Sequence, residues 1–171
     1  MREMCLVQPL SVLRDHISNQ EKVWKMTGLL SGREIEFLKA NYIARIATAS
    51  SKSVPRVSPV YFGNDAVSIY FTTETSTGKF RDISGNPQVS LVVDTFDADW
   101  LHRNGEGTRT YEKGIVLFGK AGIHWEGDLY MDMYRDLVQK YPDYRGPLRW
   151  EPGDLPIIRV VIKQIVSWRL D

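Results

Sequence analysis

The sequence predicts a mainly β (α+β) fold, an antiparallel barrel of six or seven short strands with two or three flanking helices. Most apolar segments are short and alternate with polar residues, as strands do. Most are also joined by turns, so no repeated strand–helix alternation indicates a doubly wound parallel sheet. Closing an antiparallel sheet into a barrel is the simplest way to leave no exposed edges.

The composition narrows the class of protein. The chain has 171 residues, which suits one domain, and 43% of them are apolar, which is enough to fill a barrel core. A net charge of +1 gives no electrostatic reason to expect nucleic-acid binding. Cys5 is the only cysteine, and His16, His102 and His124 are too far apart to predict a zinc site. We therefore expect no metal centre. Because no apolar run suits a signal peptide or a membrane span, we also expect a cytoplasmic protein.

The N-terminal segment differs from the rest. Its apolar residues recur at roughly helical spacing: Leu10, Leu13, Ile17 and Trp24. This pattern predicts an amphipathic helix over residues 9–26. We therefore assign residues 1–26 to an N-terminal helical extension and residues 27–171 to the barrel domain.

A second helix is predicted over residues 32–41. Ser31 and Glu34 have the spacing of a capping box, in which each side chain binds the backbone of the other residue. Leu38 then lies on the side of the helix that faces the core. After this helix the apolar period changes to that of a strand, over residues 42–49.

The next two strands are predicted to form a hairpin. They cover residues 54–62 and 66–73, and residues 63–65, with the sequence Gly-Asn-Asp, have the composition of a tight turn. Pro55 and Pro59 lack a backbone N–H group, so the first of these strands must lie at an edge of the sheet or carry bulges.

The second half of the chain adds further strands, two helices and two long loops. In order, these are a short helix over 79–84, a strand over 88–94, a polar loop over 95–110, a strand over 113–126, a helix over 129–141, a loop over 142–156, and strands over 157–162 and 165–170. Gly119 and Gly122 are expected to bend their strand, and Asp128 is expected to cap the second of these helices.

Hydroxyl residues gather in the loop that follows the predicted hairpin: Thr72, Thr73, Thr75, Ser76 and Thr77. The loop ends at Lys79, where a short helix begins. Hydroxyl groups, free backbone N–H groups at a helix start and a lysine together can surround an oxyanion. Arg56 would add a second positive charge, and phosphate is the expected ligand. On spacing alone, a solvated loop with a surface lysine is the simpler interpretation.

Four motifs, in this order, resemble the pyridoxamine 5′-phosphate oxidase-like family of FMN-binding split barrels. They are Arg56-Val57-Ser58, Phe71-Thr72-Thr73, Thr77-Gly78-Lys79, and Asn86-Pro87 before an apolar strand. The resemblance covers roughly residues 30–171. It implies a split β-barrel, and a homodimer with FMN bound between its two subunits.

The resemblance also implies which residues bind the cofactor: Arg56, Val57, Ser58, Phe71, Thr72, Thr73, Thr77, Lys79 and Trp168. Arg56 and Lys79 would bind the flavin phosphate, with hydrogen bonds from Thr73 and Thr77. The other strand residues would lie along the edge of the isoalloxazine ring. Trp168 would pack near the ring or at the dimer interface, although core packing is the more ordinary interpretation of a tryptophan there.

The chain departs from this family at three places. The family has an arginine just before the phosphate lysine, where this chain has Gly78, and an Arg-Gln pair where this chain has Lys113-Gly114. The family's C-terminal Arg-x-His substrate motif is absent. The resemblance therefore implies an FMN-dependent oxidoreductase acting on an unidentified small molecule, with its catalytic residues unknown. A deazaflavin (coenzyme F420) reductase and a non-catalytic flavin- or haem-binding protein remain alternatives.

Overall fold

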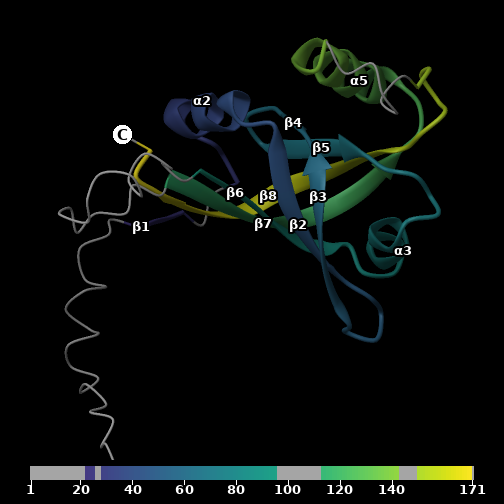
Figure 1. Cartoon of the computed structure of the whole chain (residues 1–171), viewed down its shortest axis with the longest axis horizontal. Helices are drawn as coiled ribbons and strands as arrows, with labels where there is room; N and C mark the ends of the chain where they lie inside the picture. Colours follow the sequence, from purple (N-terminus) through teal and green to yellow (C-terminus); the bar gives the residue numbers. More distant parts are fainter. Residues whose placement is uncertain (1–21, 26–27, 96–112, 143–149, 171) are drawn as a thin grey trace, which may run out of the picture.

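The computed structural model describes residues 22–25, 28–95, 113–142 and 150–170, and its strands form one curled antiparallel sheet (Figure 1). The strands are β1 (Lys22–Lys25), β2 (Ile43–Ala49), β3 (Pro55–Tyr61), β4 (Gly63–Asn64), β5 (Ser68–Thr72), β6 (Gln88–Thr95), β7 (Lys113–His124) and β8 (Ile157–Trp168). Their order is β3-β2-β6-β7-β8-β5-β4, and β1 also pairs with β8. This confirms the mainly β class and the antiparallel split barrel.

The barrel closes through the chain itself at Phe62. β3 and β4 stand at opposite ends of the strand order, yet only Phe62 separates them in the sequence. The Phe62 side chain is fully buried. Among the described residues no hydrogen-bonded ladder joins β3 to β5. The two ends of the sheet are therefore brought together by a single residue.

The predicted hairpin between residues 54–62 and 66–73 is wrong. β3 pairs with β2, and β5 pairs with β4 and β8. The turn lies two residues later than expected, because the Asp65 carboxylate accepts hydrogen bonds from the backbone N–H groups of Val67 (2.7 Å) and Ser68 (2.6 Å). The edge position expected from Pro55 and Pro59 is confirmed, since β3 ends the strand order.

The two strands predicted over residues 157–162 and 165–170 are one strand, β8. The extra residue between them is taken up by a bulge, because Phe118 faces Gln164 while the next residue, Gly119, faces Ile162. A side chain at Gly119 would meet the backbone oxygen of Val161 at 2.4 Å, so glycine is required there. The expected bend at Gly122 has no matching shift in register.

In the described part of the chain, three helices pack on the sheet: α2 (Gly32–Ala40), α3 (Gly78–Gly85) and α5 (Asp128–Lys140). The capping box of Ser31 and Glu34 is confirmed, and Glu34 is buried and also accepts a hydrogen bond from Ser167 Oγ at 2.9 Å. The expected cap at Asp128 is wrong, since Gly127, with φ 95°, precedes the helix and no side chain caps it. None of the helices in the described part of the chain is long and apolar enough to cross a bilayer.

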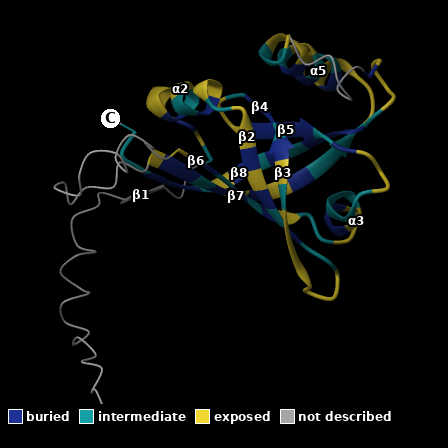
Figure 2. Cartoon of the chain, in the orientation of Figure 1, coloured by how far each residue is buried: buried dark blue, intermediate teal, exposed yellow. Residues whose placement is uncertain are grey.

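Figure 2 shows buried residues along the strands and on the helices, and within the described part of the chain they form two clusters. The larger one fills the barrel, with Leu38 of α2 at one end and Phe71 and Leu117 inside it. The smaller one lies between α5 and the strands β5 and β8, and includes Tyr70 and Tyr130. The barrel thus presents a covered face under α5 and an open outer face over β2, β6 and β7.

The helix predicted over residues 9–26 is wrong at its end. Lys22–Lys25 form β1, which pairs with β8 from Ile165 to Trp168, where β5 no longer covers that edge. An uncovered strand edge offers free N–H and C=O groups, and this favours a strand over a helix. The rest of that helix, and the polar loop with Trp100 and His102, lie outside the described residues.

Candidate functional site

The predicted hydroxyl residues meet at the start of α3. Thr77 caps the helix, and its Oγ1 accepts a hydrogen bond from the Phe80 N–H at 3.3 Å. Thr73 follows β5, and its hydroxyl lies 3.0 Å from that of Thr77. Within the described residues, the backbone N–H groups of Gly78 and Lys79 have no acceptor. The Thr77 hydroxyl donates to the backbone oxygen of Glu74 at 2.9 Å, so the contact between the two hydroxyls uses the proton of Thr73. The first turn of α3 therefore offers two free N–H groups, beside two hydroxyls that bind within the protein.

Lys79 adds an unneutralised charge at the same place. Its side chain is partly buried, and this burial lowers the pKa of its ammonium group, while Glu74 acts weakly in the opposite direction. In the part of the chain that the structure describes, Lys79 has no hydrogen-bond or ion-pair partner. Because a partly desolvated cation is stabilised by a negative partner, this arrangement favours an anion.

Arg56 approaches α3 from the edge strand. Its Nε donates a hydrogen bond to Asp82 Oδ2 at 3.0 Å, and its guanidinium lies over Gly78. A Cβ atom at position 78 would sit only 2.6 Å from Arg56 Cζ. The structure thus brings together Arg56, Thr73, Thr77 and Lys79, which the sequence placed at a phosphate.

The other strand residues have different surroundings. Val57 is 68% exposed and pairs with Ala47, on the outer face of the sheet. Ser58 is half-buried opposite Ile46, and Thr72 donates from Oγ1 to the backbone oxygen of Pro156 at 3.1 Å. Phe71 is fully buried in the barrel core, so its side chain lines no cleft.

Trp168 lies far from α3 within one chain. Thr72 pairs with Ile157, at the start of β8, whereas Trp168 is at its end. A 12-residue strand spans about 35 Å. The Trp168 ring lies on Gly114, where an added Cβ would meet its Cζ2 at 2.1 Å. One chain therefore does not bring Trp168 to the other predicted residues.

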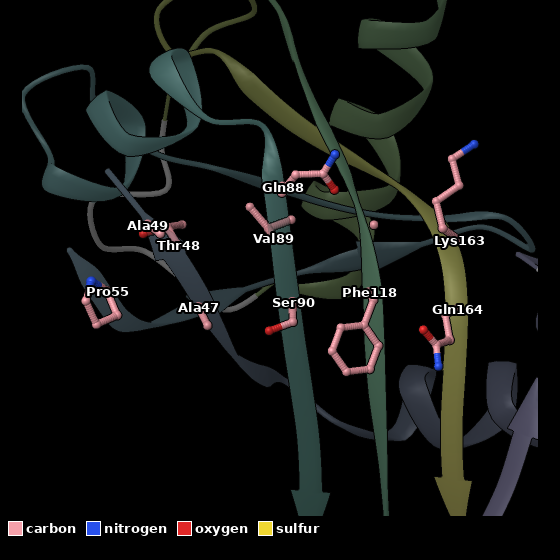
Figure 3. A pocket seen from close by; sticks show the side chains of 11 residues that line it. Ala47, Thr48, Ala49, Pro55, Gln88, Val89, Ser90, Phe118, Lys163 and Gln164 are labelled. Atoms are coloured by element: carbon pink, nitrogen blue, oxygen red, sulfur yellow. The ribbon is translucent and has the colours of Figure 1, made fainter. Parts of the chain in front are cut away.

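A groove of about 490 Å³ lies on the outer face of the sheet (Figure 3). Ser90, Phe118 and Gln164 lie side by side along it, on β6, β7 and β8 (Figure 3). Ala47 continues this row on β2, and its partner on β3 is Val57. Ser90, Phe118 and Gln164 were not predicted as site residues, although their outward positions in alternating strands were a usable signal.

Asp82 was also missed. Its carboxylate is buried and accepts hydrogen bonds from Thr48 Oγ1 at 2.8 Å and from Arg56. The Thr48 hydrogen bond and the Arg56 guanidinium hold the pKa of the Asp82 carboxyl below its usual range, although burial acts in the opposite direction. An acidic residue on the buried side of a short helix was the available signal.

Comparison with solved structures places the fold among known proteins. The haem storage protein HutZ from Vibrio cholerae is 16% identical, with a TM-score of 0.62 over 78% of this chain and 90% of that one. An F420 reductase is 23% identical, with a TM-score of 0.58 over 80% of this chain and 98% of that one. HupZ from group A Streptococcus is 18% identical, with a TM-score of 0.57 over 81% of this chain and 94% of that one. At these identities the likeness shows the fold alone.

Comparison with sequences gives the family. No curated protein sequence matches the chain significantly. The family model described as pyridoxamine 5′-phosphate oxidase matches residues 33–169, which is most of the chain and includes β2 to β8. By this match, together with the split barrel that carries it, the chain belongs to the pyridoxamine 5′-phosphate oxidase-like family.

Proposed function

We propose that this protein is an FMN-binding flavoprotein that works as a flavin-dependent oxidoreductase on a small organic molecule. The observation that carries the proposal is the partly buried Lys79 at the start of α3, which has no partner among the described residues and follows Gly78, over which Arg56 lies. The family match supports flavin as the ligand. A bound flavin would supply hydride or electron transfer, and the protein would supply binding and orientation.

The residues at α3 fit a phosphate monoester. Lys79 and Arg56 would balance its negative charge, and the hydroxyls of Thr73 and Thr77 lie within reach of the same turn. The free N–H groups of Gly78 and Lys79 would donate hydrogen bonds to its oxygens. Such charge-assisted hydrogen bonds are about twice as strong as neutral ones.

The groove on the outer face suits a flat ring. Its volume of about 490 Å³ lies within the range of about 300–1,000 Å³ that is usual for ligand sites. The row of cross-strand partners from Ala47 to Gln164 runs along it and includes the Phe118 ring, and Val57 continues the row just beyond the groove. We propose that the isoalloxazine ring lies near Val57 and Ser58, at the β3 end of this row.

The proposal includes a cytoplasmic homodimer. The outer face exposes apolar side chains on three strands, namely Ile43 (47% exposed), Val57 and Phe118 (39% exposed). A second copy would cover this face and would bring its own Trp168 to the proposed ring site. Two-fold dimers are also the commonest closed assembly of soluble proteins.

Phe118→Asp tests the dimer, because a buried carboxylate in the interface would be costly. We expect light scattering to give about twice the 19.6 kDa chain mass for the wild type and the single mass for the variant. Val138→Asp, which changes an exposed apolar residue of α5, is the control and should leave the mass unchanged. A wild-type monomer that binds FMN tightly would contradict the dimer and leave the phosphate site standing.

Cofactor extraction from the purified protein followed by mass spectrometry tests the flavin directly. We expect FMN, with the visible spectrum of an oxidised flavin. A deazaflavin is the second candidate, because the F420 reductase shares the fold, and haem is the third, because the haem storage protein HutZ shares it too. Recovery of either, with no FMN bound on titration of the apoprotein, would overturn the proposal.

Pyridoxamine 5′-phosphate is not the substrate we expect. It carries a second phosphate, which must be held beside the ring while its amine carbon faces the flavin. The family's Arg-x-His grip is absent, and Arg159 in the C-terminal strand already contacts Asp65 and Ser68. Anaerobic stopped flow should show no rapid bleaching of the flavin band with this substrate. Rapid bleaching would show that other residues bind the phosphate of this substrate. Bleaching by a reduced nicotinamide alone would indicate a reductase.

A further inference from the structure

Arg56 is held in a specific place by a buried network. Thr48 and Arg56 are direct partners across β2 and β3, and both donate to the same oxygen of Asp82, Oδ2, at 2.8 Å and 3.0 Å. The Asp82 side chain is 6% exposed, whereas that of Arg56 is 48% exposed. The buried end of this pair is therefore fixed, and the charged end faces outward.

Asp82 uses only part of the guanidinium. It accepts from Nε, and within the described residues Nη1 and Nη2 have no hydrogen-bond partner. A guanidinium has five N–H donors in a planar fork. With Nε engaged by Asp82, the plane of the fork is set while its two outer nitrogens remain free to donate.

Gly78 makes room for this arrangement. A Cβ atom there would lie 2.6 Å from Arg56 Cζ and 2.7 Å from Nε, so the guanidinium occupies the space that a side chain at position 78 would need. Gly78 does not have a positive φ, so the backbone itself does not require glycine. The absence of a side chain at the first residue of α3 thus lets Arg56 reach the helix start.

We infer that Asp82 is a positioning residue, which aligns the Arg56 guanidinium across Gly78 so that its two outer nitrogens grip a phosphate at the N-terminus of α3. This rests on the proposed function, in that the phosphate is taken to be that of the flavin. It adds that Asp82 and Thr48 set the direction of Arg56, whose guanidinium lies over Gly78. Asp82 itself touches no ligand.

The test compares FMN with riboflavin, which has the same ring and no phosphate. Fluorescence titration of the apoprotein gives the two dissociation constants, and their ratio measures the phosphate grip. Asp82→Asn should reduce this preference for FMN about tenfold, since one charge-assisted contact is misaligned. Riboflavin affinity should not change. Asp132→Asn, which breaks the exposed pair with Arg135 on α5, is the matched control and should change neither constant.

Gly78→Ala is a second variant, which tests the same proposal if Asp82→Asn fails to fold. The added methyl group meets the end of the Arg56 side chain, so it should displace Arg56 and lower the preference for FMN while Asp82 keeps its carboxylate. Loss of the Arg56 contact should lower the melting temperature slightly, and a single cooperative transition would show that the fold is kept. In an Arg56→Ala background, Asp82→Asn should have no further effect on that preference. A wild type without preference for FMN would defeat the proposed function. A wild-type preference that survives both Asp82→Asn and Gly78→Ala would defeat the role of Asp82 alone.

Discussion

The helices α3 and α5 use their polar side chains in opposite ways. On α5, the Tyr130 hydroxyl donates to the backbone oxygen of Leu155 at 3.0 Å and accepts from the Gly153 N–H. The Tyr134 hydroxyl donates to the backbone oxygen of Trp150 at 3.1 Å. These hydroxyls bind backbone groups of neighbouring segments, so they fix how those segments pack.

Just beyond α5, the Tyr141 hydroxyl contacts three backbone groups. It accepts from the Phe62 N–H at 2.9 Å and lies within hydrogen-bond distance of the backbone oxygens of Phe62 (2.8 Å) and Tyr42 (2.9 Å). Phe62 is the residue at which the barrel closes, and it belongs to no strand. A side chain thus satisfies the backbone groups that no neighbouring strand reaches.

At α3 the polar groups remain available. Lys79 has no partner in the described part of the chain, and Arg56 keeps two nitrogens free. Burying polar groups without partners costs free energy, so the fold gains no stability from Lys79 or from the outer nitrogens of Arg56. Polar groups around α5 thus stabilise the structure, whereas Lys79 and the outer nitrogens of Arg56 belong to the ligand site that we propose. Substitutions should separate the two effects.

Lys79→Ala should have the largest effect on binding. Loss of a charge-assisted contact to phosphate amounts to about 1.5–3 kcal/mol, or roughly a tenfold to hundredfold weaker affinity for FMN. Its stability should not fall, because Lys79 has no partner to lose. Lys52→Ala, in the exposed turn between β2 and β3, is the control. Equal FMN affinities of the two variants in a fluorescence titration would rule out Lys79 as the phosphate lysine.

Tyr141→Phe should show the reverse. Removing the hydroxyl leaves the Phe62 N–H without its partner, which should lower the free energy of unfolding by about 1–3 kcal/mol. FMN affinity should stay within twofold of the wild type. Urea denaturation measures the first, and titration the second. Tyr42→Phe, whose exposed ring contacts that of Tyr141, is the matched control. A Tyr141→Phe protein that is as stable as the wild type but binds FMN more weakly would contradict the assignment of this hydroxyl to stability.

The smallest effect concerns pH. Burial lowers the pKa of Lys79 in the free protein, and only the protonated amine attracts phosphate. As the pH rises through this lowered pKa, FMN affinity should fall, and it should begin to fall at a lower pH than for an ordinary lysine. Below that pKa affinity should be flat until the phosphate itself titrates. Calorimetry at alkaline pH should detect proton uptake on binding, and Lys79→Ala should abolish it.

Local signals in the sequence predicted much of the fold. The capping box of Ser31 and Glu34 depends on residues three apart, and the prolines of β3 restrict their own strand wherever it pairs. The hairpin failed because pairing is a long-range choice. β3 had Gly63 and Asn64 beside it in the sequence, yet its partner is β2, and those two residues joined β5.

The candidate site divides in the same way. Thr77 and Lys79 were predictable, because a cap and a helix start are local features. Asp82 was not, since its partners are 26 and 34 residues away in sequence. Phe71 came from the resemblance alone; its side chain is fully buried, and its part at the flavin stays a prediction. Trp168 lies far from the other predicted residues within one chain, and its role at the flavin stays a prediction.

The strand order also bears on how the chain folds. β8 lies between β7 and β5, so until it is in place β3, β2, β6 and β7 form one piece and β4 and β5 another. The hydrogen bond that closes the barrel joins residues 79 apart in sequence. Folding dominated by such distant pairings is slow, and unpaired strand edges stay open to aggregation meanwhile. On the ribosome, the barrel can therefore form only after residue 168 has emerged.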